Sequence, residues 1–208
     1  MKCSLCNSKT SSFFKTITKE YFKCNNCDAI CMNPLNYFTE IQEIKRYTEH
    51  NNDINDIRYQ NFVNPIVKSV LADFDTTNNG LDFGCGTGPV ITKLLRDKNY
   101  TITTYDPFFE NNLESLKTTY NFIVCCEVIE HFHQPLKEFK LLKSLLKPSG
   151  KLYCMTDVFN QSINFENWYY KNDETHVIFY TKNTFDWIKN ELGFSKVSVL
   201  NRLIIFEI

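Results

Sequence analysis

The sequence predicts an α/β fold, a doubly wound and mostly parallel sheet, with a small cysteine-rich module in front of it. Two observations lead to this fold class. Short apolar segments alternate with amphipathic helical segments from about residue 56 to residue 208, and parallel strands need such crossover helices. Two Cys-x-x-Cys pairs lie between Met1 and Pro34. We therefore expect a module at 1–34, a polar connector with some helix at 35–55, and an α/β domain at 56–208.

Periodicity places each element of the α/β domain. Apolar side chains recur at helical spacing from Ile57 to about Phe74. The run at 120–126 is almost continuously apolar, as in a strand buried on both faces. Further strands are expected at 80–84, 101–105, 151–155, 195–200 and 203–208, and further helices at 87–97, 136–146 and 184–192.

Composition narrows the functional class. The chain has 208 residues, 43% of them hydrophobic and 23% charged, which suits one α/β domain plus a short module. Its formal net charge of −1 argues weakly against a nucleic-acid partner, which usually requires a basic surface. The sequence contains no apolar run of membrane-spanning length and no apolar segment near Met1, so we expect a cytoplasmic protein. Oligomeric state leaves no sign in the sequence.

The cysteine pairs predict a metal site. Cys3 with Cys6 and Cys24 with Cys27 flank the stretch 7–23, a spacing typical of four thiolates around tetrahedral zinc. A segment of this size cannot fold by burial alone, and zinc contributes on the order of 10 kcal/mol. A redox disulfide is the main alternative, although neither pair opens a helix after a strand, and Cys31 could replace one ligand. Such a zinc ribbon either grips a substrate or partner, or only stabilises the start of the chain.

A glycine loop carries the clearest chemical signal. Gly84, Gly86 and Gly88 follow a predicted strand that contains Asp82 and precede a predicted helix. Glycines in this place let a ligand approach the backbone closely. The spacing does not match the G-x-G-x-x-G fingerprint of dinucleotide sites, and the lysine of a P-loop is absent.

The stretch Leu81–Gly88 resembles the first motif of class I S-adenosylmethionine-dependent methyltransferases, and the resemblance extends over about residues 56–208. It implies a Rossmann-like fold and S-adenosylmethionine as cofactor. The positions that match place its amino-acid end against Asp82, Gly84, Cys85, Gly86 and Gly88, and its ribose hydroxyls on Asp106. The interval between Asp106 and the next strand, which starts at Tyr120, is short. The family commonly has a helix, a strand and an adenine-contacting acid there. The backbone near Cys126 is the candidate adenine contact.

Acids and histidines follow the strand at 120–126, at the sheet edge where open α/β folds bind ligands. Glu127, Glu130 and His131 form an E-x-x-E-H pattern, and His176 lies in a later loop after the aromatic residues 168–170. Oxygen and nitrogen donors mixed in this way suit Mg, Mn, Zn or Fe. The pattern resembles the quinone-biosynthesis O-methyltransferases and the small-RNA 3′-end 2′-O-methyltransferases, which implies these four residues as ligands of a second divalent cation. Acid–base or substrate contact without metal, and a purely structural role, stay open.

The favoured function is methyl transfer from S-adenosylmethionine to a hydroxyl oxygen of a small molecule, in the manner that the quinone-pathway resemblance implies. An RNA methyltransferase that grips RNA through Lys15, Lys19 and Lys23 of the ribbon is one alternative. A methyltransferase acting on a sugar or a carbon atom is another, and a non-catalytic binding module is the third. The sequence leaves the identity of the acceptor open.

Overall fold

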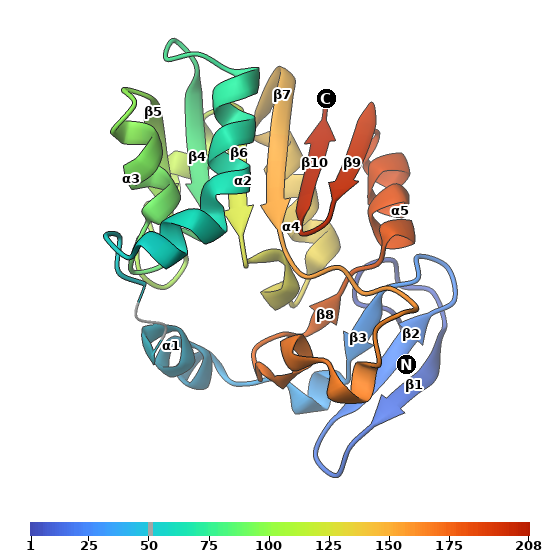
Figure 1. Cartoon of the computed structure of the whole chain (residues 1–208). Coiled ribbons are helices and arrows are strands. Elements are labelled where there is room, and N and C mark those ends of the chain that lie inside the picture. Colours follow the sequence, from blue (N-terminus) through green and yellow to red (C-terminus); the bar gives the residue numbers. More distant parts are fainter. Residues whose placement is uncertain (50–51) are drawn as a thin grey trace.

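A computed structural model of the protein describes residues 1–49 and 52–208. It contains a six-stranded sheet in the order β5-β4-β6-β7-β10-β9 and a four-stranded sheet in the order β1-β2-β3-β8 (Figure 1). The large sheet consists of β4 (Asn79–Phe83), β5 (Thr101–Tyr105), β6 (Tyr120–Cys126), β7 (Leu146–Met155), β9 (Lys196–Leu200) and β10 (Leu203–Glu207). The predicted α/β fold is confirmed, and all six predicted strands are present.

Five strands of the large sheet run in one direction, and β10 runs in the opposite one. β5, β4, β6 and β7 run parallel to their neighbours, whereas β10 is antiparallel to both β7 and β9. The sheet ends at β5. Between β5 and β6 the chain forms only the short 3-10 helix η2 (Leu113–Lys117) and an isolated bridge between Asp106 and Glu110. The short interval after Asp106 thus leaves one edge of the sheet without a further strand.

Helices cover both faces of the large sheet. α2 (Ile57–Asp73) and α3 (Val90–Arg96) pack on one face, against Phe122 and Val124. α4 (Pro135–Ser144) and α5 (Lys182–Leu192) pack on the other, against Ile123 and Cys125. Successive side chains of β6 therefore point to opposite faces and are buried on both, as its apolar run predicts. Within 1–49 and 52–208, no helix combines the length and the apolar character needed to cross a membrane.

The small sheet combines strands from two distant parts of the chain. Its first three strands, β1 (Thr10–Lys15), β2 (Glu20–Cys24) and β3 (Ile30–Met32), come from the cysteine-rich module. Its fourth, β8 (Ile178–Phe179), comes from the loop before α5 and pairs antiparallel with β3 (Figure 1). The sequence did not predict β8, because so short a strand has no periodicity of its own and depends on its partner.

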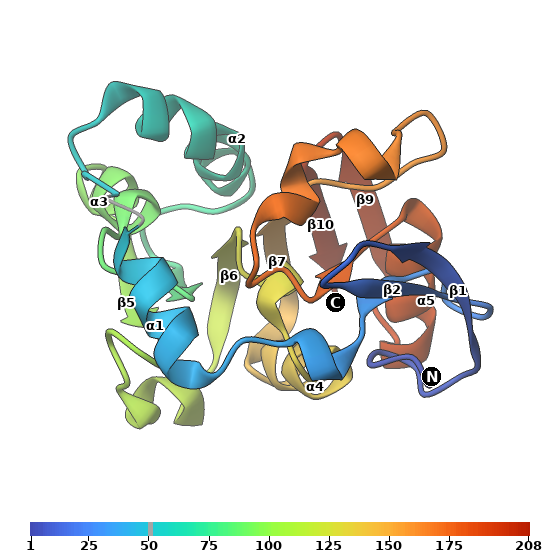
Figure 2. The same ribbon diagram turned by 90° about the horizontal axis from the view of Figure 1, so that it is seen from below.

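The connector contains the 3-10 helix η1 (Pro34–Asn36) and the helix α1 (Glu40–Glu49). Figure 1 shows α1 below the carboxyl end of β4, and Figure 2 shows it next to β5. Asn33 caps η1 through its side chain, which accepts a hydrogen bond from the Leu35 amide. The helix expected within 35–55 is therefore present, and it covers the edge of the sheet that carries the glycine loop.

Candidate active site

A cavity of about 800 Å³ opens at the carboxyl ends of β4, β5 and β6. Its walls come mainly from α1, the glycine loop, the loop after β5, the turn after β6, and the segment from Tyr169 to His176, with Tyr59 on α2 and Glu138 on α4. Ligand sites of open α/β sheets lie at this edge, and the volume is that of a typical small-molecule pocket. The cavity is thus the candidate active site.

The glycine loop is tied to the end of β5. The amides of Gly84 and Cys85 donate to the carbonyl of Tyr105, and the amide of Gly86 donates to Asp106 Oδ2 at 3.0 Å. Gly86 adopts φ +62°, and a Cβ added there would meet no atom within 4 Å. Gly86 and Cys85 line the cavity, so this open space is part of it. Gly88 lies outside the main cavity, where a Cβ would collide with the carbonyl oxygen of Asn52.

Asp106 lies beside Gly86 at the cavity wall. Its Oδ1 accepts from the amides of Phe108 and Phe109, at 2.9 and 3.1 Å, which fixes the carboxylate at the end of β5. A carboxylate has about four acceptor sites and three are used here, so Oδ2 keeps the capacity to accept one further hydrogen bond from a ligand. Cys126, at the end of β6, lines the same cavity.

Asp82 occupies a different position from the other loop residues. It is buried and does not line the cavity, and its Oδ2 accepts from the hydroxyl of Thr92 on α3 at 2.7 Å. Burial raises the pKa of Asp82 to about 6, against the opposing effect of the Thr92 hydrogen bond. In this structure Asp82 therefore acts on the loop indirectly, by joining β4 to the helix that follows the glycines.

Asp82→Asn is expected to flatten the pH dependence of stability. The unfolded carboxyl ionises near pH 3.9 and the folded one near pH 6, so the folded state holds an extra proton between these values. Stability from this group is therefore fully present below pH 3.9 and is lost as pH rises through 6, a difference of about 3 kcal/mol. Urea unfolding of both proteins at pH 4.5 and 7 measures about 2 kcal/mol of this difference. An equal pH dependence in both would contradict the assignment.

Glu127 follows β6 in a conformation that is unusual for a residue with a side chain. Its φ is +53°, in the left-handed region. Both of its carboxylate oxygens accept from Arg202 Nη2, at 2.7 and 2.8 Å. Arg202 also contacts Asp157 at 3.3 Å and donates to the hydroxyl of Tyr169 at 2.9 Å. Arg202 lies in the β9–β10 turn, and no motif marks it, so the sequence did not point to this partner.

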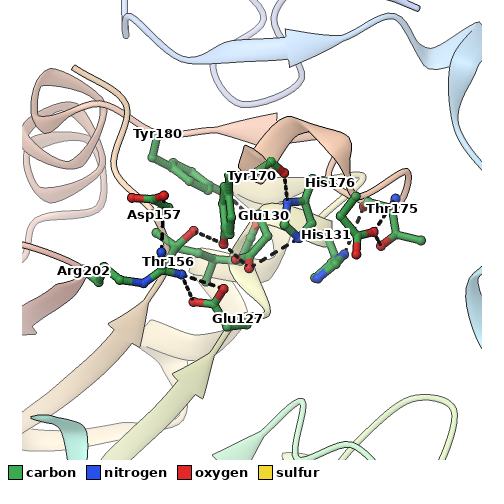
Figure 3. A network of polar contacts seen from close by, with 12 residues as sticks. Glu127, Glu130, His131, Thr156, Asp157, Tyr170, Thr175, His176, Tyr180 and Arg202 are labelled. Carbon is green, nitrogen blue, oxygen red and sulfur yellow. Dashed lines mark hydrogen bonds and ion pairs between the residues drawn. The ribbon is translucent and has the colours of Figure 1, made fainter. Parts of the chain in front are cut away.

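Glu130 is buried among polar groups (Figure 3). Its Oε1 accepts a hydrogen bond from the hydroxyl of Tyr170, which leaves Thr156 to donate to that hydroxyl at 3.0 Å. Among the described residues nothing bonds to Glu130 Oε2. Burial, and then the charge of Glu127, raise the pKa of Glu130 well above its usual value. An orphaned carboxylate oxygen at full burial is costly, so the site suits a further cation or proton.

His131 and His176 lie with their ring centroids 4.8 Å apart. Nδ1 of His131 bonds to the carbonyl of Thr175 at 3.0 Å, and Nδ1 of His176 bonds to the carbonyl of Tyr170 at 2.7 Å. A carbonyl only accepts, so each Nδ1 carries the hydrogen and each neutral ring keeps its lone pair on Nε2. Burial lowers the pKa of His131 to about 3, which keeps this ring neutral at physiological pH.

Three of the four predicted acid and histidine residues thus come together. One donor atom each of Glu130, His131 and His176 lies within 4.8 Å of the others, a donor set that a divalent cation accepts. Glu127 lines the same cavity but is engaged by Arg202. The structure therefore offers three ligand positions in one cluster and a fourth carboxylate in an ion pair.

Helix α1 contributes side chains that the sequence did not single out. Arg46 pairs with Asp173 at 2.8 Å, and Glu43 pairs with His133 Nε2 at 2.8 Å. The ring of Tyr47 packs on His131, with centroids 5.2 Å apart. These contacts join the connector to the segment that carries Asp173 and to the turn after β6 that carries His131 and His133. The polar composition of residues 35–55 gave no sign of this role, because the partners come from distant segments.

The four predicted zinc ligands also come together. The Sγ atoms of Cys3 and Cys27 lie 3.6 Å apart, those of Cys6 and Cys24 lie 3.3 Å apart, and all four lie within 4.8 Å of one another. Tetrahedral zinc with bonds of about 2.3 Å places its sulfur ligands about 3.8 Å apart, so the thiols fit this ion. Cys31 Sγ lies 3.8 Å from Cys3 and accepts from the hydroxyl of Ser4.

The comparison with protein families decides the class of this domain. The family described as "Methyltransferase domain" matches residues 55–199, which is most of the chain. The chain belongs to this family. The predicted resemblance is thereby confirmed.

Relatives of this methyltransferase agree with the assignment. A "Ubiquinone biosynthesis O-methyltransferase" of Actinobacillus pleuropneumoniae is 28% identical over 95 residues, which are 44% of this chain and 41% of the relative. The methyltransferase thus spans less than half the length of the curated relatives it matches.

Solved structures share the fold. An S-adenosylmethionine-dependent methyltransferase of Archaeoglobus fulgidus has a TM-score of 0.52 at 21% identity, over 67% of this chain and 71% of that one. A Burkholderia thailandensis 1,6-didemethyltoxoflavin-N1-methyltransferase, solved with that compound and S-adenosylhomocysteine, has a TM-score of 0.57 at 11% identity, over 95% of this chain and 98% of that one. The predicted Rossmann-like fold of this methyltransferase is therefore confirmed.

Proposed function

We propose that the protein transfers a methyl group from S-adenosylmethionine to a hydroxyl oxygen of a small molecule. Residues 1–34 would act as a zinc ribbon, 35–55 as a connector and 56–208 as the catalytic domain. One observation carries the proposal: the open space at Gly86 and the two histidines of the cluster, His131 and His176, border the same cavity. Cofactor and acceptor positions are thus adjacent. The printed activity of the Actinobacillus relative supports an oxygen acceptor.

The chemistry needs a deprotonated acceptor in line with the sulfonium methyl group. The glycine loop and Asp106 would hold the cofactor, Nε2 of His176 would accept the hydroxyl proton, and Nε2 of neutral His131 would orient the oxygen. A divalent cation, when bound, would be held by Glu130, His131 and His176, and it would lower the hydroxyl pKa. The protein then needs to supply little beyond alignment, because the sulfonium is already activated.

Charge in the cavity favours a neutral or cationic ligand. The charged side chains that line it are five carboxylates and one arginine: Glu43, Asp106, Glu127, Glu138, Asp173 and Arg46. The arginine is already paired with Asp173. S-adenosylmethionine carries a sulfonium and an ammonium group, which suit such walls. A polyanionic acceptor would meet repulsion here.

The ribbon lysines give little support to an RNA grip. Lys15 forms an ion pair with Glu20, and Lys23 forms one with Asp28 at 2.8 Å. Lys19 is half-buried near the negative charges of Glu174 and Asp173. Phosphate binding would have to displace these carboxylates, so a small molecule is the better-supported acceptor.

The proposal is tested with S-adenosylmethionine labelled in its methyl group. Purified protein is incubated with hydroxylated aromatic compounds, with sugars and with a short RNA bearing a free 3′ hydroxyl, with and without Mg²⁺, Mn²⁺ or Zn²⁺. Label should appear in the neutral hydroxylated compounds. Label in the RNA alone would favour the RNA alternative, and failure to bind S-adenosylhomocysteine would favour a non-catalytic module.

His176→Ala is expected to lower turnover about 100-fold or more, since it removes a proton acceptor or ligand from the cluster. The dissociation constant for S-adenosylhomocysteine should change little, because the glycine loop lies in a different wall. His133→Ala is the matched control, because His133 also lines the cavity but pairs with Glu43 outside the cluster. Equal turnover of both variants would remove His176 from the site.

A further inference from the structure

We infer that the zinc ribbon supports the acceptor wall of the active site, by which we mean residues 165–176. In this arrangement, zinc in the ribbon positions His176 and Tyr170. This inference rests on the proposed function and on the proposed zinc ligands. It assigns the ribbon a positioning role within the methyltransferase itself, in place of a grip for a separate partner.

A continuous backbone path leads from the cysteines to His176. Strand β3 pairs with β8, with Cys31 opposite Ile178 and Ile30 opposite Phe179. The amide of Met32 donates to the carbonyl of Val177 at 2.8 Å, and the amide of Val177 donates to the carbonyl of Glu130 at 2.9 Å. Val177, the residue after His176, is thus held between the ribbon and the turn that carries Glu130 and His131.

Aromatic packing forms a second path, to Tyr170. One cluster of buried side chains contains Tyr21, Ile30 and Met32 of the ribbon together with Phe165, Trp168 and Tyr170 of the acceptor wall, among others. Phe13 on β1 packs edge-to-face on Phe165, with centroids 5.1 Å apart. Trp168 then packs on Tyr170 at 5.4 Å. Tyr170 bonds Glu130 through its hydroxyl and His176 through its carbonyl, so ribbon packing sets both.

The proposed zinc ligands lie where both paths begin, next to strands β2 and β3. Cys24 is the last residue of β2, and Cys27 lies in the turn that leads to β3. A metal bound to both fixes that turn, and the turn fixes the register of β3 against β8. β8 contains only Ile178 and Phe179, so it has little stability without its partner. By contrast, the hydrogen bonds of the glycine loop come from Tyr105 and Asp106 on the opposite side of the cavity.

The first test removes zinc from the full chain, by chelation and by Cys24→Ser with Cys27→Ser. The chain has four histidines, so ¹⁵N-imidazole NMR resolves each ring, with assignment by single His→Gln variants. Zinc loss should shift or broaden the His176 signals and raise amide exchange at 168–179 about tenfold or more. Amide exchange in the glycine loop, residues 84–88, should stay unchanged, because its hydrogen bonds come from Tyr105 and Asp106. The dissociation constant for S-adenosylhomocysteine should stay within about threefold of wild type.

The second test leaves the zinc ligands intact, in case the zinc-free chain unfolds. Phe13→Ala removes a ring that packs on Phe165 and Phe159, and Ile17→Ala is the control, a fully exposed apolar residue in the same β1–β2 hairpin. Both variants should keep one zinc by elemental analysis. Phe13→Ala should shift the His176 signals, and Ile17→Ala should not.

Each outcome decides a separate point. An unchanged His176 environment in both the zinc-free protein and Phe13→Ala would overturn the positioning role. If the wild-type protein did not bind S-adenosylhomocysteine, the proposed function itself would be overturned. A wild-type chain that is folded and free of zinc would overturn the inference through its premise.

Discussion

Gly86→Val is expected to abolish detectable binding of S-adenosylhomocysteine. The space in front of Gly86 is open and belongs to the cavity, so an isopropyl group would fill the volume that the ligand needs. A β-branched residue also resists the φ of +62° at this position, at a cost of about 1–2 kcal/mol. Calorimetric titration of the ligand into each protein measures the loss.

Gly193→Val is the matched control for this substitution. Gly193 ends α5 at φ +69°, and its nearest neighbour for an added Cβ is Lys143 Nζ at 3.5 Å, so the backbone strain is similar. It lies outside the lining of the cavity. Both variants should lose comparable thermal stability, but only Gly86→Val should lose affinity. Unchanged affinity of Gly86→Val would refute the cofactor assignment.

Arg202→Met is expected to destabilise the protein by about 3 kcal/mol, because it leaves the carboxylate of Glu127 in the site without its bidentate partner. Both side chains are largely shielded from water, at 21% and 27% exposure. Asp157 loses a contact to the same arginine. The free energy of unfolding in urea at pH 7 measures the effect.

Arg58→Met is the control that shows how much of the stability effect comes from burial of the ion pair. Arg58 likewise makes two hydrogen bonds to one carboxylate, that of Asp56, but its side chain is 92% exposed. Water and salt screen such a pair, so its loss should leave stability unchanged. A large effect of Arg58→Met, or none of Arg202→Met, would show that burial does not set the strength of these pairs.

The sequence predicted the large sheet well because periodicity acts locally. The strands at 101–105 and 120–126 have the predicted bounds, since each apolar run is fixed by its own residues. The glycine loop was also recognisable, because strand, acid, glycines and helix follow one another without a gap. The cysteine spacing predicted the thiol cluster for the same reason: each pair is local and only two pairs had to meet.

What the sequence could not provide was contacts between distant segments. Arg202 approaches Glu127 across 75 positions, and Arg46 approaches Asp173 across 127. Such partners share no sequence motif, and they come together only when the sheet folds. The sequence also could not predict which way the side chain of Asp82 points. The motif gives its position in the chain but does not say whether it faces the cavity or Thr92. The role of α1 in the cavity wall has the same cause.

The pairing of β3 with β8 has a consequence for synthesis of the chain. The cysteine module leaves the ribosome before the methyltransferase domain, but the strand that completes its sheet, Ile178–Phe179, follows only after most of that domain has been made. At typical translation rates this delay is on the order of ten seconds, during which the free edge of β3 is open to other chains. Chaperones that shield exposed strands, and early capture of metal by the four thiols, would matter most in that interval.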